Sequence, residues 1–217
     1  MGFFLYLCRM KQYPIVEYFY SLQGEGANAG KPAYFLRLSG CSVQCAFCDS
    51  KNSWDRENAE ELSSEEITEI VRGCLNFARD DCAKNVVITG GEPLLHDLNE
   101  LCKTIRTHIP NVNLWLETSG AAKFSGDFDW ICLSPKKKCF PFAENYAKAN
   151  ELKIVIENSD DFEFAEMQAQ QVNPNCKLFL QAEWSEEKNI TKSIIDYILK
   201  NPKWRLSLQL HKVLNIQ

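Results

Sequence analysis

Short strand-like segments alternate with helix-like segments after residue 30, and this alternation limits the possible fold more than any other feature of the sequence. The strand-like segments are apolar, and the helix-like segments repeat apolar residues every three or four positions. We predict strands at 33–38, 86–89, 112–116, 130–133, 152–156, 177–181 and 204–209. We predict helices at 63–77, 97–108, 162–170 and 190–199.

This pattern indicates a parallel sheet, because parallel neighbours need a long crossover connection that a helix usually supplies. A full eight-unit (β/α) barrel usually needs about 250 residues, whereas this chain has 217. The expected fold class is therefore α/β, as an incomplete (β/α) barrel of about six parallel strands or an open α/β sheet. In either fold, ligands bind beyond the carboxyl ends of the strands.

Charge and hydropathy exclude some partners. The formal net charge of −5 argues against a broad nucleic-acid surface, and no apolar run approaches the roughly 18 residues that a membrane span needs. The first ten residues lack the features of a secretory signal, so we expect a cytoplasmic protein with reduced thiols.

We also expect an N-terminal extension at 1–13, with Met1 or Met10 as the start, and a single domain at 14–217.

Three of the ten cysteines lie in one predicted loop. Cys41, Cys45 and Cys48 have the spacing C-x3-C-x2-C. Three thiolates can bind three irons of a [4Fe–4S] cluster and leave the fourth iron open to a ligand that is not protein. A zinc site with a fourth ligand such as a histidine also fits the spacing, and so does a chance grouping in a cysteine-rich chain.

A second motif, ITGGEP at 88–93, ends the next predicted strand. Its glycines would allow close approach of a polar ligand, or simply make a tight turn. C-x3-C-x-F-C and GGEP together are typical of radical S-adenosylmethionine (SAM) enzymes, and this chain resembles that superfamily. The resemblance implies that the open iron binds the amino and carboxylate groups of SAM, and that reductive cleavage yields a 5′-deoxyadenosyl radical.

Further segments narrow the resemblance to one family. They are YSLQGEG at 20–26, FLRLSG at 35–40, CDS at 48–50 followed by Trp54, LETSG at 116–120, LSPK at 133–136, LKIVI at 152–156 and LQLHK at 208–212. From about residue 14 onwards the chain resembles the 7-carboxy-7-deazaguanine synthases, which implies a single radical SAM domain at 14–217.

The resemblance also implies a reaction. Enzymes of this family convert 6-carboxy-5,6,7,8-tetrahydropterin to 7-carboxy-7-deazaguanine with loss of ammonia, in queuosine and other 7-deazapurine biosynthesis. The radical removes hydrogen from C6 of the pterin and later returns it, so that SAM is regenerated, and Mg²⁺ assists. Expected partners are the pterin, an electron donor such as flavodoxin and a second copy of the chain, with the product serving tRNA modification.

Site residues follow from the same resemblance. The cluster would be bound by Cys41, Cys45 and Cys48. SAM would be bound by Phe47, Cys48, Asp49, Gly91, Glu92, Glu117, Ser134, Pro135, Lys136 and Gln181. The pterin would be bound by Leu22, Gln23, Gly24, Glu25, Arg37, Thr89 and Gln217. Ser50 would give its hydroxyl oxygen to Mg²⁺, a cation that prefers oxygen ligands.

Some of these roles have a physical reason and a simpler alternative. A guanidinium suits a carboxylated substrate, yet Arg37 on a strand could face solvent. Gln23 and Glu25 suit a pterin edge that presents donors and acceptors, yet Glu25 could stabilise its own glycine loop. His211 could contact the substrate region, but we favour a structural role for it.

Two other functions compete with the synthase. A glycyl-radical-enzyme activase has the same cysteine spacing but acts on a protein partner, and the YSLQGEG segment argues against it. A zinc-binding module without enzymatic activity would hold one metal ion per chain and would not react with SAM.

Overall fold

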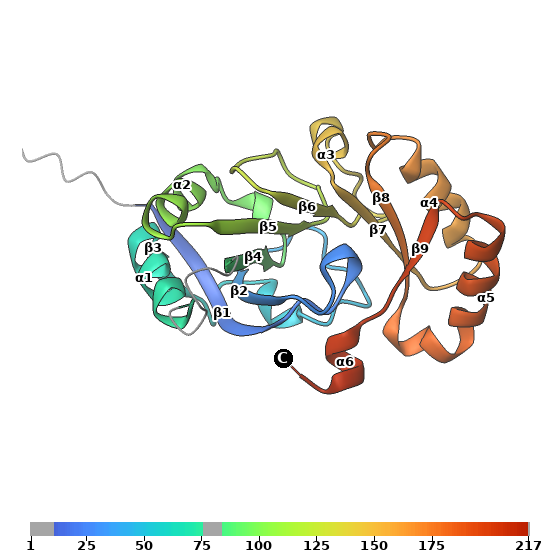
Figure 1. Ribbon diagram of the computed structural model, residues 1–217, viewed down its shortest axis with the longest axis horizontal. Helices are drawn as coiled ribbons and strands as arrows, with labels where there is room; N and C mark the ends of the chain where they lie inside the picture. The colour runs from blue at the N-terminus through green and yellow to red at the C-terminus, as the bar shows by residue number, and fades with distance from the viewer. Residues whose placement is uncertain (1–10, 76–83, 217) are drawn as a thin grey trace, which may run out of the picture.

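The computed structural model describes residues 11–75 and 84–216. One mixed sheet of nine strands runs through these residues in the order β3-β1-β2-β4-β5-β6-β7-β8-β9 (Figure 1). The strands are β1 (Gln12–Leu22), β2 (Pro32–Leu38), β3 (Glu60–Ser63), β4 (Lys84–Gly90), β5 (Val112–Thr118), β6 (Trp130–Leu133), β7 (Glu151–Ile156), β8 (Lys177–Ala182) and β9 (Trp204–Ser207). The sheet is open, since its edge strands β3 and β9 do not pair with each other.

Six α-helices and four 3₁₀ helices accompany the described strands. The α-helices are α1 (Ser64–Leu75), α2 (Asn99–His108), α3 (Ala143–Lys148), α4 (Asp161–Ala169), α5 (Glu187–Lys200) and α6 (Leu210–Leu214). The 3₁₀ helices are η1 (Gly26–Asn28), η2 (Lys51–Ser53), η3 (Pro93–Leu95) and η4 (Trp184–Glu186). Figure 1 shows α1 and α2 at one end of the sheet and α4 and α5 at the other.

The predicted parallel sheet is confirmed, but the expected number of about six strands is too low. Seven strands, β2 and β4 to β9, pair in parallel, and each corresponds to a predicted strand. β1 and β3 add an antiparallel edge that the sequence analysis missed. β3 has only four residues and begins with two exposed glutamates, so it lacks an apolar pattern.

The remaining differences are two short helices that were not predicted, α3 and α6, and the ends of some elements. β9 ends at Ser207, and α6 begins three residues later, where we predicted that the strand continues to residue 209. α3 was missed because it has only six residues. The predicted N-terminal extension lies mostly outside the described residues, and β1 begins at Gln12, before the predicted domain start at residue 14.

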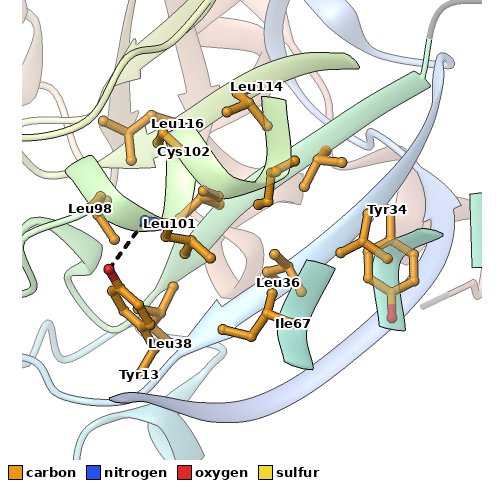
Figure 2. Packing of buried hydrophobic residues seen from close by; sticks show 14 of the residues in the cluster. Tyr13, Tyr34, Leu36, Leu38, Ile67, Leu98, Leu101, Cys102, Leu114 and Leu116 are labelled. Carbon is orange, nitrogen blue, oxygen red and sulfur yellow. Dashed lines mark hydrogen bonds between the residues drawn. The ribbon is translucent and has the colours of Figure 1, made fainter. Parts of the chain in front are cut away.

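The larger core cluster joins β1, β2, β4 and β5 to α1 and α2 (Figure 2). The Tyr13 hydroxyl group lies among these apolar side chains and accepts a hydrogen bond from the backbone N–H of Leu101, at 3.2 Å. This N–H is in the first turn of α2, where it has no partner within the helix. The contact therefore fixes the start of α2 to β1. A second cluster packs α4 and α5 against β7, β8 and β9.

Among the described helices, none is long and apolar enough to cross a membrane.

Replacing Leu101 by Ala should destabilise the fold by about 2–5 kcal/mol, because Leu101 is fully buried between α2 and the sheet. Leu199→Ala is the matched control, since Leu199 also lies on a helix but is 77% exposed, and its change should stay within about 0.5 kcal/mol. Urea unfolding followed by circular dichroism measures both. Equal unfolding midpoints for the two variants would contradict this description of the core.

Candidate active site

A cavity of about 300 Å³ opens at the carboxyl end of the parallel strands. Its walls come from β1 and the loop after it, β2 and the loop after it, the ends of β4 to β8, and Gln209 with the start of α6. The expected meeting of the cysteine loop and the Gly-Gly turn beyond the strands is confirmed, since the three cysteines and both glycines line this cavity.

Most of the predicted site residues share this cavity. They are Leu22, Gln23, Gly24, Glu25, Arg37, Cys41, Cys45, Phe47, Cys48, Asp49, Ser50, Thr89, Gly91, Glu117, Ser134, Lys136 and Gln181. Glu92 and Pro135 are not among its lining residues, and Gln217 lies outside the described residues. What each residue binds stays a prediction.

The cysteine loop holds three free, partly exposed thiols. Backbone N–H groups donate to two of the sulfurs, from Gln44 to Cys41 at 3.5 Å and from Ser50 to Cys48 at 3.4 Å. Burial raises the pKa of the Cys45 thiol, and the nearby Lys136 opposes this shift. Hydrogen bonds to the sulfurs are one of the features that tune an iron–sulfur cluster.

Within residues 11–75 and 84–216, no group of three or more His, Cys, Asp or Glu side chains is placed to hold one metal ion.

The Gly-Gly turn after β4 packs directly on the start of the cysteine loop. Gly91 N–H donates to the Leu38 carbonyl at 3.1 Å, and Glu92 N–H donates to the Gly40 carbonyl at 2.8 Å. A Cβ at Gly91 would lie 2.5 Å from the Gly40 carbonyl oxygen and 2.7 Å from the Cys41 Cβ. Glycine is needed here for close packing, so the turn and the cysteine loop form one unit.

The Glu92 carboxylate is fully buried and fully engaged by protein donors. It accepts hydrogen bonds from Leu94 N–H at 3.0 Å, from Ser119 N–H at 2.8 Å, and from the hydroxyls of Thr118 and Ser119. Glu92 therefore caps η3 and ties the turn after β4 to the end of β5. Binding of SAM by Glu92 stays a prediction.

Arg37 lines the cavity, and the alternative that it faces solvent is not supported. Its Nη1 donates to the Ser50 hydroxyl at 3.0 Å, and its Nε pairs with the Glu17 carboxylate on β1. The Ser50 hydroxyl donates to Asp49 at 3.1 Å. Burial raises the pKa of the Asp49 carboxyl, but the ion pair with Lys212 outweighs burial and leaves this pKa lowered.

Glu25 and Lys153 lie at the centre of a buried polar network. The Lys153 ammonium pairs with the Glu25 carboxylate and, at 3.2 Å, with Glu117. Glu25 also accepts hydrogen bonds from the side-chain amides of Gln181 and Gln209, each at 3.0 Å. Burial alone would raise the pKa of Glu25, but the charge and hydrogen bond of Lys153, with help from Gln209, lower it to about 2.

The alternative role for Glu25, stabilising its own glycine loop, is not supported either. Other side chains hold that loop, because Gly26 N–H donates to Ser207 at 3.0 Å and Ala27 N–H donates to Glu151 at 2.9 Å. The Glu25 carboxylate instead contacts β7, β8 and the segment before α6.

Several residues that line the cavity were not predicted from the sequence. Lys153 could have been noticed, because a lysine between apolar residues of a buried strand is unusual. His211, for which we favoured a structural role, lines the cavity beside Gly24, where a Cβ would lie 2.4 Å from its Nδ1 atom. Phe19 and Phe35 stack at 5.0 Å and form an apolar wall, and no motif indicated that pair.

Comparison with known proteins adds an independent line of evidence. Residues 22–124 match the family model described as a 4Fe-4S single cluster domain. The 7-carboxy-7-deazaguanine synthase of Flavobacterium psychrophilum is 47% identical over 203 residues, which cover 94% of this chain and 92% of the relative. The synthase of Synechocystis sp. is 47% identical over 94% of each chain, and that of Escherichia coli is 32% identical over 94% of this chain and 99% of the relative.

The fold agrees with these matches. The crystal structure of QueE from Escherichia coli resembles this structure with a TM-score of 0.79 and 31% sequence identity, over 92% of this chain and 95% of that chain. Since similarity of sequence and of fold extends over nearly the whole of both chains, this chain belongs to the 7-carboxy-7-deazaguanine synthase family.

Proposed function

We propose that this chain is a radical SAM enzyme that converts 6-carboxy-5,6,7,8-tetrahydropterin to 7-carboxy-7-deazaguanine with release of ammonia, in queuosine and 7-deazapurine biosynthesis. The observation that carries the proposal is one cavity that combines three free thiols with buried polar side chains of both charges. A pterin has donor and acceptor edges and this substrate also has a carboxylate, so it needs both kinds of partner. Family membership supports the same reaction.

Cys41, Cys45 and Cys48 would hold the [4Fe–4S] cluster, and SAM would bind beside them. When bound, the cluster and SAM supply the radical that starts the reaction. Residues from four segments around the thiols would contact SAM: Phe47 and Asp49, Gly91, Glu117, and Ser134 with Lys136. Burial lowers the pKa of Lys136, while its ammonium group donates to the Ser134 hydroxyl and carbonyl at 2.6 Å. Gln181, Glu92 and Pro135 would complete this set.

The pterin would lie between the loop after β1 and the ends of β2 and β4. Arg37 would bind its carboxylate, and Gln23 and Glu25 would face its ring edge, with Leu22, Gly24 and Thr89 around them. The stacked Phe19 and Phe35 offer a flat apolar surface for a planar ring. Gln217 would add a further contact from the end of the chain.

Ser50 would bind Mg²⁺ through its hydroxyl oxygen, which suits a cation that prefers oxygen ligands. Arg37 donates to one lone pair of this oxygen, and the second lone pair is available to a cation. A substrate carboxylate next to Ser50 would attract the guanidinium and complete the environment of the cation.

The domain organisation, oligomeric state and electron donor are proposed from the family. We propose that residues 14–217 act as one radical SAM domain whose open sheet is an incomplete barrel. The working form would be a homodimer in the cytoplasm, and it would receive electrons from a donor such as flavodoxin. Its product would enter the pathway of tRNA modification.

Anaerobic reconstitution tests the reaction itself. Protein with iron, sulfide, reductant, SAM, Mg²⁺ and 6-carboxytetrahydropterin should form 7-carboxy-7-deazaguanine, detected by mass, without stoichiometric loss of SAM. The Cys45→Ala variant is the control and should give no product. If 5′-deoxyadenosine accumulates without the expected product, the substrate is wrong. If no cluster forms, the zinc-binding module becomes the better explanation.

The Ser50→Ala variant should lose most of its activation by Mg²⁺ while its cluster absorbance stays normal, because the change removes an oxygen ligand and leaves the cysteines in place. Product formation is measured across a series of magnesium concentrations. Ser193→Ala, an exposed serine on α5, is the control and should respond as the unmodified protein does. An unchanged magnesium response in Ser50→Ala would rule out this metal ligand.

Arg37→Ala should raise the KM for the pterin about ten- to a hundredfold, which corresponds to the roughly 1.5–3 kcal/mol of a charge-assisted hydrogen bond. Glu17→Gln is the matched control, because it removes the ionic partner of Arg37 but keeps the guanidinium. Steady-state kinetics with varied pterin compare the two variants. A normal KM in Arg37→Ala would show that the guanidinium does not bind the substrate.

A further inference from the structure

Lys153 lies in the wall of the cavity and has a side chain that is only 6% exposed. It belongs to β7, where Leu152 and Ile154 on either side point into the core. Burying an ammonium group costs several kcal/mol unless good partners surround it. An apolar residue at this position of β7 would avoid the free-energy penalty of burying a charge. A functional reason for Lys153 and its partners is therefore expected.

These partners come from two segments with different proposed roles. Glu25 follows β1 and belongs to the proposed pterin site, whereas Glu117 lies near the end of β5 and belongs to the proposed SAM site. The Lys153 ammonium contacts one carboxylate oxygen of each, Oε2 in both cases. One buried cation thus lies between the two halves of the cavity.

The other oxygen of each carboxylate orients glutamine amides. Glu25 Oε1 accepts from Gln181 and Gln209, and Glu117 Oε1 accepts from Gln23 at 3.0 Å. The side-chain amide oxygen of Gln23, Oε1, in turn accepts a hydrogen bond from the backbone N–H of Glu25 at 3.2 Å. Both carboxylates and all three amides line the cavity, so their orientation decides which donors and acceptors a ligand meets.

We propose that Lys153 is a positioning residue that couples the two halves of the active site, holding Glu25 for the pterin and Glu117 for SAM. This inference rests on the proposed function. Without the cation, two neighbouring carboxylates would be buried without their common partner, and one of them would take up a proton or turn away. Gln23 would then lose its fixed orientation, and both ligands would bind more weakly.

The test compares Lys153→Met with Lys177→Met, a lysine on the adjacent strand β8 that is exposed and lies outside the cavity. In Lys153→Met, the KM values for the pterin and for SAM should both rise about ten- to a hundredfold. Binding of 6-carboxypterin to reconstituted protein with SAM and no reductant, measured by calorimetry, should weaken by a similar factor. The cluster absorbance should not change, and Lys177→Met should behave as the unmodified protein.

A second pair of variants separates positioning from stability. Glu25→Gln should raise the KM for the pterin alone, because Lys153 keeps its contact with Glu117. The double variant Lys153→Met/Glu25→Gln removes one charge of each sign and should fold even if Lys153→Met does not. Its KM for SAM should still be raised, since Glu117 has lost its partner.

The outcomes distinguish the two claims. If the unmodified protein forms no product, the proposed function fails, and the inference fails with it. If the unmodified protein turns over but the folded Lys153 variants keep normal KM values and normal calorimetric affinity, the reaction stands and Lys153 is only a structural residue. A rise in the KM for one ligand alone in Lys153→Met would contradict coupling between the two halves.

Discussion

Seven parallel strands end at one edge of the sheet, and the candidate site depends on this constraint more than on any single side chain. Each parallel strand except the last, β9, continues into a crossover connection to the next, so the loops at the carboxyl edge are free to carry functional groups. The cysteine loop follows β2 and the Gly-Gly turn follows β4, and backbone hydrogen bonds join them. The sheet thereby brings together groups that are far apart in the sequence, such as Cys45 and Lys136.

Buried charge gives this cavity its chemical character. Lys153, Glu25 and Glu117 form an ionic group that an apolar core would not need, and buried ion pairs are often no more stabilising than well-packed apolar residues. We infer that these charges serve ligand binding. Glu92 shows the opposite case, because its carboxylate is satisfied entirely by the protein and serves to hold the turn that packs on the cysteine loop.

The local pattern of apolar and polar residues was sufficient to predict most strands, but not the antiparallel strands at the edge of the sheet. β5 and β7 are mostly apolar segments between polar turns, so their positions could be predicted within two residues. β3 exists only because it pairs with β1 at the edge, which no local signal indicates. The motifs identified the segments that form the cavity. The contact of Lys153 with Glu25 joins positions 128 residues apart, so the spacing of residues within a motif could not predict it. The motif likewise did not show that Thr118, Ser119 and Leu94 would donate hydrogen bonds to the Glu92 carboxylate.

If the pterin and SAM share this cavity, hydrogen from C6 of the pterin passes to the 5′ carbon of SAM. Turnover with substrate that carries deuterium at C6 measures this transfer, through the isotope content of the SAM recovered afterwards. We expect deuterium at the 5′ carbon of the recovered SAM. Product formation with unlabelled SAM and with deuterium released to water would contradict a shared cavity.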